Sequence, residues 1–300
     1  MREIGPEAGA FAALTLVWGT TWAAIRISLE GIPPLTGIAA RFLLAGLLLL
    51  ALARWRGVRL GASPVERRLW ALNTVATFAV PYGIIYWAEQ WVPSGLASVL
   101  FATFPLWIVV FGRWILPGER PDARRLLGVA LGFAGVALIF SEDFERLGGS
   151  EVRWPAAVLL GGAAISASAS VAIRRWGAGI SPFSLASVPM LLTGVLVGGL
   201  AAAVERDRPL ELSAGPVAAT LYLAVFGSAL TFSLYFWLLA RRSAVVASLV
   251  SYTAPVVAVA VGLLLLDEPF TARVGVGAAL VLTGVAGALR GPRVGVRGGA

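Results

Sequence analysis

The chain contains no cysteine, no histidine and no lysine among its 300 residues. Without cysteine it has no disulfide framework, no thiolate nucleophile and no cysteine metal site. Without histidine it lacks the commonest general base and metal ligand, and the usual group that titrates near neutral pH. We therefore expect no enzyme activity, no cofactor and no bound metal.

Charge is also scarce. Charged residues make up 13% of the chain, whereas an average globular protein has about 25%. Hydrophobic residues make up 58%, and the mean hydropathy is +0.85. These values exclude a soluble enzyme. All 24 basic residues are arginine, and 16 acidic residues oppose them, which leaves a net charge of +8. Such a surplus suggests nucleic acid or an anionic membrane surface until the arginines are placed along the chain.

Charge-free stretches divide most of the sequence. Nine stretches carry no charged residue, and a tenth is interrupted only by Arg41. About 20 apolar residues in a helix cross a bilayer core of about 30 Å. The sequence therefore predicts an all-α membrane protein with ten transmembrane helices, at 8–25, 31–53, 69–88, 90–112, 126–141, 154–173, 176–204, 212–240, 243–266 and 274–289. Because Glu3 and Glu7 precede the first stretch, we do not interpret it as a signal peptide.

The arginines favour one side of these spans. With the N-terminus inside, 17 of the 24 arginines fall in cytoplasmic segments, six fall outside, and Arg41 lies within the second span. This asymmetry follows the positive-inside rule and predicts that both termini are cytoplasmic. The basic surplus is thus an orientation signal, and nucleic acid is not an expected partner. The short loops favour a bacterial inner membrane.

The sequence repeats itself at an offset near 150 residues. Trp87, Ala97, Ser98, Thr103 and Pro105 recur as Trp237, Ala247, Ser248, Thr253 and Pro255. We expect two halves, 1–145 and 146–300, with five helices each. An odd number of helices inverts the second half in the membrane. Inverted repeats around a site near the midplane are typical of secondary transporters, where exchanging the two conformations gives alternating access.

Four motifs, two of them present in both halves, carry a resemblance to a known family. They are the Trp18-Gly19 pair, the Arg41-Phe42 pair, the Ala-Ser…Pro stretches that end at Pro105 and Pro255, and the acidic turns at Glu119 and Glu268. Because it carries these motifs in this order, the chain resembles the drug/metabolite transporter superfamily, specifically its ten-helix EamA type. The resemblance implies ten helices in two inverted halves and the movement of small metabolites, often the efflux of amino acids.

Polar and aromatic residues that share a helical face are candidates for a transport pathway. Trp18 and Trp22 are spaced four apart, as are their repeat counterparts Ser166 and Ser170, so an aromatic stripe in one half faces hydroxyls in the other. An interfacial aromatic belt is the alternative for Tyr86, and close helix packing is the alternative for the serines. The predicted substrate-binding residues are Trp18, Trp22, Phe78, Tyr82, Tyr86, Ser98, Phe101, Ser166, Ser170, Thr231, Tyr235, Ser248 and Tyr252.

Prolines within the spans predict kinked or broken helices. Pro105 and Pro255 occupy matching repeat positions, which is a pointer to a binding site in transporters. Pro81 frees a backbone carbonyl in the third span. We expect these three prolines to serve in gating, with an ordinary structural kink as the alternative.

Arg41 is the one formal charge well inside a predicted span. Burying an arginine at the middle of a membrane helix costs about 2.5–3.5 kcal/mol on insertion scales, so a partner is expected. Glu89 is the first candidate, and Glu30 is the second. Two roles stay open for Arg41: a structural contact that holds helices together, or binding of a substrate carboxylate.

The charged residues that the predicted spans lack limit the classes of substrate that we expect. A phosphate carrier should gather several cations near the midplane, and a cation/proton exchanger needs a deep carboxylate. Among the charged residues, only Arg41 lies well inside a predicted span, whereas Glu89 lies near the end of one. The expected substrate is a small amphipathic metabolite, most of all an exported aromatic or hydrophobic amino acid. A multidrug or other-metabolite transporter is the first alternative, and a non-transporting membrane sensor or scaffold is the second.

The expected partners are the small-molecule substrate and the lipid bilayer. Gly128, Gly132 and Gly135 in the fifth span, and Gly277 and Gly284 in the tenth, predict close packing of small residues. The protein is therefore expected to be a monomer, or a homodimer that forms through these two spans.

Overall fold

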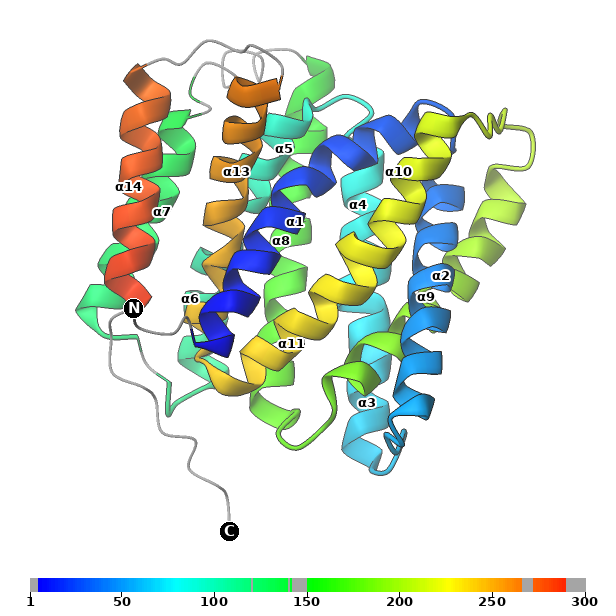
Figure 1. The fold of residues 1–300 in the computed structure, drawn as a ribbon, viewed down its shortest axis with the longest axis horizontal. Coiled ribbons are helices and arrows are strands. Elements are labelled where there is room, and N and C mark those ends of the chain that lie inside the picture. The colour runs from blue at the N-terminus through cyan, green and yellow to red at the C-terminus, as the bar shows by residue number, and fades with distance from the viewer. Residues whose placement is uncertain (1–4, 120, 140, 142–149, 266–271, 290–300) are drawn as a thin grey trace.

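The computed structural model of the chain describes residues 5–119, 121–139, 141, 150–265 and 272–289. Regular structure in these residues is helical, and the helices lie side by side as a bundle (Figure 1). A helix satisfies its own backbone hydrogen bonds, which a bilayer requires of any spanning segment. In chain order the elements are α1 (Pro6–Leu29), α2 (Pro34–Trp55), α3 (Pro64–Asn73), the π-helix η1 (Thr74–Ala79), α4 (Val80–Ala88), α5 (Ser94–Phe101), α6 (Phe104–Ile115), α7 (Ala123–Ile139), α8 (Ser150–Trp176), α9 (Pro182–Val204), α10 (Ala214–Ala224), the π-helix η3 (Val225–Leu230), α11 (Thr231–Arg241), α12 (Ala244–Ser248), α13 (Val250–Leu265) and α14 (Ala272–Leu289).

These elements join into rods that follow the ten predicted spans. Seven rods among the described residues are long and apolar enough to cross a membrane, and shorter apolar helices complete the bundle. The composite rods are α3–η1–α4, α5–α6, α10–η3–α11 and α12–α13. The all-α membrane fold is therefore confirmed. The predicted boundary between the halves, at residues 145 and 146, lies outside the described residues.

Proline begins several of these helices. Pro6, Pro34, Pro64 and Pro182 each occupy the first position of a helix. That position needs no intrahelical N–H donor, and the fixed φ of proline already suits the helix. These prolines set the ends of the rods without weakening their interiors.

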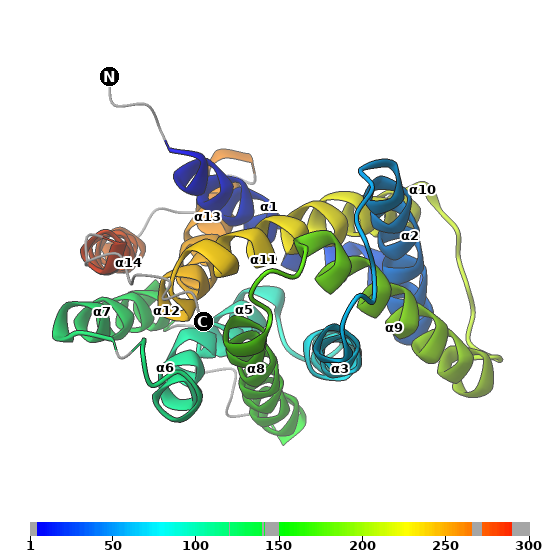
Figure 2. The same cartoon turned by 90° about the horizontal axis from the view of Figure 1, so that it is seen from below.

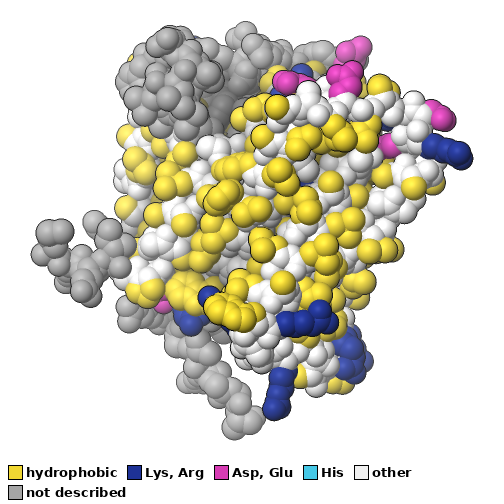
Figure 3. Space-filling model, turned by 45° about the vertical axis from the view of Figure 1, so that its right-hand side comes forward, with side chains coloured by type: hydrophobic (Ala, Val, Ile, Leu, Met, Phe, Trp, Pro, Cys, Tyr) yellow, Lys and Arg dark blue, Asp and Glu magenta, His cyan; other side chains and the backbone are white. Residues whose placement is uncertain are grey.

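The bundle has two chemically different ends. The basic end is the one with the loops 56–63, 117–122 (described except for residue 120), 177–181 and 242–243, and there Arg242 forms an ion pair with Glu7. The acidic end has the loops 30–33, 89–93 and 205–213, and carries Glu30, Glu89, Glu205, Asp207 and Glu211. Figure 3 shows acidic side chains gathered at the top, most arginines at the bottom and an apolar surface between them. This apolar surface has the character of a lipid-facing belt.

Helices α2 and α9 pack tightly and run antiparallel. A Cβ added to Gly46 would lie 2.8 Å from the Leu191 nitrogen, and one added to Gly194 would lie 2.8 Å from the Leu43 nitrogen. Gly46 and Leu43 precede Gly194 and Leu191 by the same 148 residues, so each half contributes the same contact to the other. Equivalent helices that pack antiparallel are the arrangement expected of two inverted halves.

Helices α7 and α14 form a second pair with the same reciprocity. A Cβ on Gly135 would lie 2.5 Å from the Gly277 carbonyl oxygen, and one on Gly128 would lie 2.5 Å from the Gly284 carbonyl oxygen. This pair and the α2–α9 pair stand at opposite ends of the long axis of the molecule (Figures 1 and 2). The glycine faces predicted for a dimer contact are thus used within one chain. A homodimer through the outer faces of these helices stays a prediction.

A π-helix interrupts the third and the eighth rods at matching positions. The segment η1 covers 74–79 and η3 covers 225–230, which are 151 residues apart. Pro81 has no N–H for the Thr77 carbonyl, which accounts for the disturbed hydrogen bonding near η1. Phe232 occupies the matching position near η3, so that segment has no such cause. Isolated π turns within α-helices are frequent at functional sites.

The fourth and ninth rods are broken, as the paired prolines predict, but at different distances from them. Helix α5 ends at Phe101 and α6 begins at Phe104, so Pro105 is the second residue of the new helix. The break in the ninth rod lies at Leu249, and Pro255 lies within α13. Pro105 therefore stands at the start of a helix, whereas Pro255 stands in a helix interior.

Candidate functional site

A small cavity lies among the first, third, fourth, sixth and eighth rods and has a volume of about 90 Å³. Helices α1, α4, α8 and α11 supply most of its wall, and α2, η1, α5, α6 and α13 supply the rest. The predicted residues that line it are Trp18, Trp22, Arg41, Pro81, Tyr82, Ser98, Phe101, Ser166, Ser170 and Tyr235. The structure thus brings together residues that are more than 200 positions apart in the chain.

Aromatic rings form the larger part of this wall. The Trp18 ring lies 5.5 Å from the Tyr235 ring and 5.7 Å from the Phe232 ring, the latter edge-to-face. The Trp22 ring meets Phe101 edge-to-face at 5.9 Å. Edge-to-face pairs at such distances are favourable by about 0.5–1.5 kcal/mol each. They hold the wall in one arrangement and present ring edges and faces to a bound solute.

Hydroxyl groups face this aromatic wall. The Tyr235 hydroxyl donates a hydrogen bond to Ser170 Oγ at 3.2 Å, and this pair joins the eighth and sixth rods. Ser166 lines the cavity one helical turn before Ser170. The predicted pairing of an aromatic stripe in one half with hydroxyls in the other is therefore present in the geometry.

Arg41 is the charged residue among the described residues that line the cavity, and its side chain is 1% exposed. Its Nε donates to Ser228 Oγ at 2.7 Å and its Nη2 donates to the Gly227 carbonyl at 3.0 Å. The guanidinium carbon lies 4.5 Å from the Tyr82 ring centroid, which is a cation–π distance. These acceptors come from η3, and not from Glu89 or Glu30, the partners expected from the sequence.

One nitrogen of the Arg41 guanidinium takes part in neither of these hydrogen bonds. Nη1 of Arg41 is buried and has no hydrogen-bond partner within the described part of the chain. A buried cationic donor without an acceptor is unfavourable unless a ligand or water supplies one. The two other nitrogens anchor the guanidinium, Tyr82 and Tyr86 also interact with it, and Nη1 is the nitrogen that can bind an acceptor in the cavity.

Three predicted aromatic residues lie outside the cavity wall. Phe78 packs behind it, with its ring 4.8 Å from the Phe232 ring. Tyr86 and Tyr252 are fully buried between helices, where they contact Gly37 and Gly132. The missing side chains of those glycines make room for the rings. Their aromatic character is thus used for packing in this conformation.

Two predicted hydroxyl residues, two of the predicted prolines and Glu89 also lie outside the cavity wall. Ser248 donates to the Val245 carbonyl at 2.7 Å within its own helix. Thr231 is completely buried at the start of α11. Pro105, Pro255 and Glu89 are close to the wall in sequence but do not line the cavity.

Nine wall residues were not predicted from the sequence: Thr21, Ile25, Thr77, Ile85, Ala102, Phe104, Phe232, Ser251 and Ala254. Thr21 follows Trp18 by three positions, and Ser251 follows Ser248 by three, so helical spacing places each near a predicted residue. Phe232 precedes Tyr235 by three positions and Thr77 precedes Pro81 by four, so the same spacing places these two near predicted residues as well. Thr77 lies within η1, and Phe232 lies in the first turn of α11, directly after η3.

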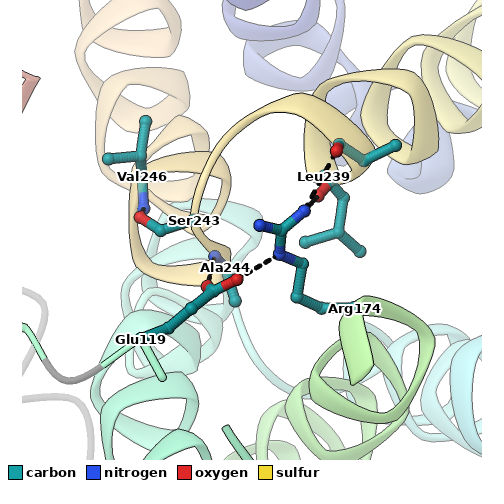
Figure 4. Close-up of polar contacts among 7 residues, drawn as sticks. Glu119, Arg174, Leu239, Ser243, Ala244 and Val246 are labelled. Atoms are coloured by element: carbon teal, nitrogen blue, oxygen red, sulfur yellow. Dashed lines mark hydrogen bonds and ion pairs between the residues drawn. The ribbon is translucent and has the colours of Figure 1, made fainter. Parts of the chain in front are cut away.

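A second cavity of about 410 Å³ lies toward the basic end. Arg174 closes one side of it by an ion pair with Glu119 and by donating to the Leu239 carbonyl at 2.9 Å (Figure 4). Glu119 also accepts from the Ala244 backbone N–H at 3.3 Å. Arg174 therefore links the sixth rod to the eighth and, through Glu119 and Ala244, to the loop after the fourth rod and the start of the ninth.

The acidic end repeats part of this arrangement. Arg26, the repeat counterpart of Arg174, donates from Nη1 to the Glu89 backbone carbonyl. Glu89 is the repeat counterpart of Leu239. The same arginine-to-carbonyl contact thus occurs at both ends of the central cavity. Glu268, the counterpart of Glu119, lies outside the described residues.

Acidic side chains do not gather into a metal site in the part of the chain that the structure describes, where no group of three or more histidine, cysteine, aspartate or glutamate residues is close enough to hold a metal ion. The chemistry available at the cavity is therefore hydrogen bonding, ring stacking and one positive charge. This set can recognise a solute.

Known proteins share both the sequence pattern and the fold. Residues 7–141 and 153–290 each match the model of the EamA-like transporter family. The inner membrane transporter YedA of Escherichia coli is 36% identical over 265 residues, which cover 87% of this chain and 83% of YedA. Protein PagO of Salmonella typhimurium is 28% identical over 250 residues, covering 83% and 81%. A solved crystal structure matches with a TM-score of 0.79 over 94% of this chain and 96% of its own, and its 21% identity supports the fold alone.

Proposed function

We propose that this chain, which belongs to the EamA-like transporter family, exports amino acids, above all aromatic and hydrophobic ones. That it is a multi-pass inner membrane transporter follows from its family and relatives and from its apolar helices. The substrate class and the direction are our proposal. The observation that carries it is the free Nη1 of Arg41 beside an aromatic wall.

The two features match the two parts of an aromatic amino acid. A carboxylate accepts a charge-assisted hydrogen bond from Arg41 Nη1, which is about twice as strong as a neutral one. The ring of the substrate stacks against Trp18, Trp22 and Tyr82. Serine and threonine hydroxyls around the cavity accept hydrogen bonds from the substrate amino group.

The charge count argues against phosphorylated cargo. A sugar phosphate or nucleotide sugar would call for several cations at the cavity, and Arg41 stands alone there among the described residues. A zwitterion needs only one positive partner and neutral acceptors for its amine. The cavity therefore fits an amino acid better than a phosphate ester.

The size of the cavity requires motion. Its volume of about 90 Å³ is well below the roughly 300–1,000 Å³ of typical ligand pockets, so its walls must separate to admit an aromatic amino acid. We propose that the inverted halves exchange conformations to open one end at a time. The arginine asymmetry of the sequence supports an orientation with the basic end and both termini in the cytoplasm.

Transport in proteoliposomes tests this proposal. We expect uptake of phenylalanine, tryptophan and methionine to exceed that of alanine and serine, and phenylethylamine, which lacks the carboxylate, to compete poorly with phenylalanine. Empty liposomes give the background. Efflux from cells that overproduce the protein, measured as a lower internal phenylalanine pool, tests the direction. No uptake of any of the five amino acids by folded protein would contradict the proposal.

A multidrug transporter of the same fold is the second candidate, because most of the wall is aromatic and apolar. Planar cationic dyes stack on such walls but would be repelled by Arg41. If a dye is transported and amino acids do not compete with it, this second function replaces the first. Competition by phenylalanine would support the amino acid site.

A further inference from the structure

Glu89 is a buried acidic residue that the proposed site does not use. It caps the C-terminus of α4 immediately beyond the span Pro64–Ala88, and it is 0% exposed. Ile85, one helical turn earlier on the same face, lines the central cavity. Neither carboxylate oxygen of Glu89 has a hydrogen-bond partner within the described part of the chain. The side chain thus lies one turn from the cavity, toward the acidic end.

The groups around Glu89 come from three helices. Arg26 of α1 and Arg41 of α2 are the charged side chains that act on it, and Tyr86 is its titratable neighbour on α4. Arg26 uses Nη1 for the backbone carbonyl of Glu89 and not for its carboxylate. Helix α8, which also packs against α4, carries its charged residues near its two ends, at Glu151, Arg153, Arg174 and Arg175.

Burial without a donor favours the protonated carboxyl. Desolvation raises the pKa of Glu89 well above its ordinary value, although Arg26 and Arg41 oppose the shift. A conformation that raises the pKa of a carboxyl is stabilised as the pH falls, because it binds the proton more tightly than a conformation that exposes the group to water. The closed arrangement around Glu89 is therefore the proton-bound one.

The two halves differ at this position. The contact of Arg26 with the Glu89 carbonyl matches that of Arg174 with the Leu239 carbonyl, so both ends share the arginine contact. Only the acidic end has a carboxyl at this position, since residue 239 is leucine. A proton-dependent response at this contact is thus built into one end and not the other.

We propose that Glu89 is the proton-binding residue of the transport cycle: it takes up one proton from the acidic side when that end is open, and the protonated side chain is buried when that end closes. The identification of the site as a transporter site rests on the proposed function. One O–H bond forms at a carboxylate oxygen and the same bond breaks when the proton leaves toward the other side. No other bond changes, so each cycle carries a proton inward while a substrate moves outward.

Site-directed labelling tests this without any substrate. Because the chain has no cysteine, an Ile25→Cys variant carries one thiol, in the cavity wall beside Arg26. A membrane-impermeant maleimide should reach it from the acidic side only when that end opens. The exposed Ser213→Cys variant at the same end corrects for the ionisation of the thiol itself. We expect the corrected labelling rate to fall roughly fivefold or more between pH 8 and pH 6, within the range of usual coupling free energies.

Replacing Glu89 should remove this response. In Ile25→Cys with Glu89→Gln, labelling should stay low at both pH values, because glutamine resembles the protonated carboxyl. Glu89→Asp, which keeps a carboxyl, and Glu30→Gln at the same end should keep the pH response. Labelling that is independent of pH in the parent, or a response that survives Glu89→Gln, would overturn the proposal. If Glu89→Gln does not fold, Glu89→Asp decides: a pH response that is kept but has a shifted midpoint pH supports the proposal, and an unchanged midpoint pH contradicts it.

A transport measurement separates this inference from the proposed function. Glu89→Gln should keep phenylalanine exchange between the two sides of a liposome, which moves no net proton, and should lose accumulation driven by a pH gradient. Accumulation that persists in Glu89→Gln overturns the role of Glu89 and leaves the amino acid site intact. Absence of transport in the parent protein, with pH-dependent labelling still present, overturns the substrate and leaves the proton site intact.

Discussion

Arg41 shows how a membrane protein keeps one charge buried. Its guanidinium is held by a hydroxyl, a backbone carbonyl and the face of Tyr82, so three kinds of acceptor share one cation. Hydrogen bonds to a charged group stabilise by about 1.5–3 kcal/mol each, which offsets the cost of burying the arginine. Because these partners use only part of the guanidinium, the same residue both joins α2 to η3 and offers Nη1 to a ligand.

Replacing Arg41 separates these two roles. We expect Arg41→Gln to weaken amino acid transport by roughly 10-fold to 100-fold, the loss of one charge-assisted hydrogen bond, and to let the cation phenylethylamine compete better because the repelling charge is gone. Arg41→Lys should restore little, since an ammonium cannot reproduce the planar set of donors. The measurement is the concentration dependence of uptake in proteoliposomes.

Arg206→Gln is the matched control, because Arg206 is exposed at the acidic end. It should transport like the parent. If Arg41→Gln is folded, by its gel-filtration profile in detergent, and transports amino acids normally, then Arg41 is a structural residue alone and the carboxylate site lies elsewhere.

At the scale of elements, close packing of glycine sets the positions of the paired helices. The α7–α14 and α2–α9 pairs bring backbone atoms together where a methyl group would not fit. In a bilayer the hydrophobic effect gives helices little reason to associate, so such close contacts carry much of the attraction. These two antiparallel pairs are well placed to act as the fixed flanks of the bundle while the rods around the cavity move.

One pair of valine substitutions tests this packing. A Cβ at Gly284 would lie 2.7 Å from the Gly128 carbonyl oxygen, whereas one at Gly287, three residues on, meets nothing within 4 Å. We expect Gly284→Val to destabilise the protein by about 1–3 kcal/mol, as overpacking does, and to lower the thermal unfolding midpoint in detergent. Gly287→Val carries the same change in helix propensity and should unfold like the parent. Equal midpoints for the two variants would show that the α7–α14 contact is not as tight as described.

The interrupted rods are a second feature of this scale. In η1 and η3 the hydrogen-bonding pattern loosens, and these segments hold Thr77 on the cavity wall and the Arg41 acceptors Gly227 and Ser228. A π turn shifts the register of side chains on either side of it. Gly227 and Ser228 of η3, in the second half, thus contact an arginine of the first half.

At the scale of the whole molecule, the arginine asymmetry predicts the orientation in the membrane. Glu7 near the start of α1 pairs with Arg242, and Ala288 near the end of α14 packs on Gly128, so both ends of the described chain lie toward the basic end. The positive-inside rule then predicts two cytoplasmic termini.

Reporter fusions test this orientation. Green fluorescent protein fused to the C-terminus should fluoresce in bacterial cells, since it matures in the cytoplasm. Alkaline phosphatase fused after Asp207, in the loop of the acidic end, should be active, and the same enzyme fused after Arg242 should be inactive. An active phosphatase after Arg242 would reverse the orientation and, with it, the side from which Glu89 takes its proton.

The sequence by itself determined the class of the protein. Charge-free stretches of helical length, arginines in alternate loops and a repeat at an offset near 150 residues predict the membrane fold, because each is a local or periodic property of the chain. The family was indicated by the resemblance of the motifs. The aromatic stripe of Trp18 and Trp22 and the hydroxyls of Ser166 and Ser170 were also predictable, since helical spacing places the two residues of each pair on one face of the same rod.

The tertiary structure alone decided which of these residues share a cavity. Tyr86 and Tyr252 are aromatic like the residues of the cavity wall but are buried against glycines, whereas Tyr82 and Tyr235 line the cavity. The partner of Arg41 was expected to be an acid of the same half and is a hydroxyl and a carbonyl of the other. Contacts between halves depend on how inverted rods pack, which is a property of three dimensions, and the sequence spacing within one helix carries no information about it.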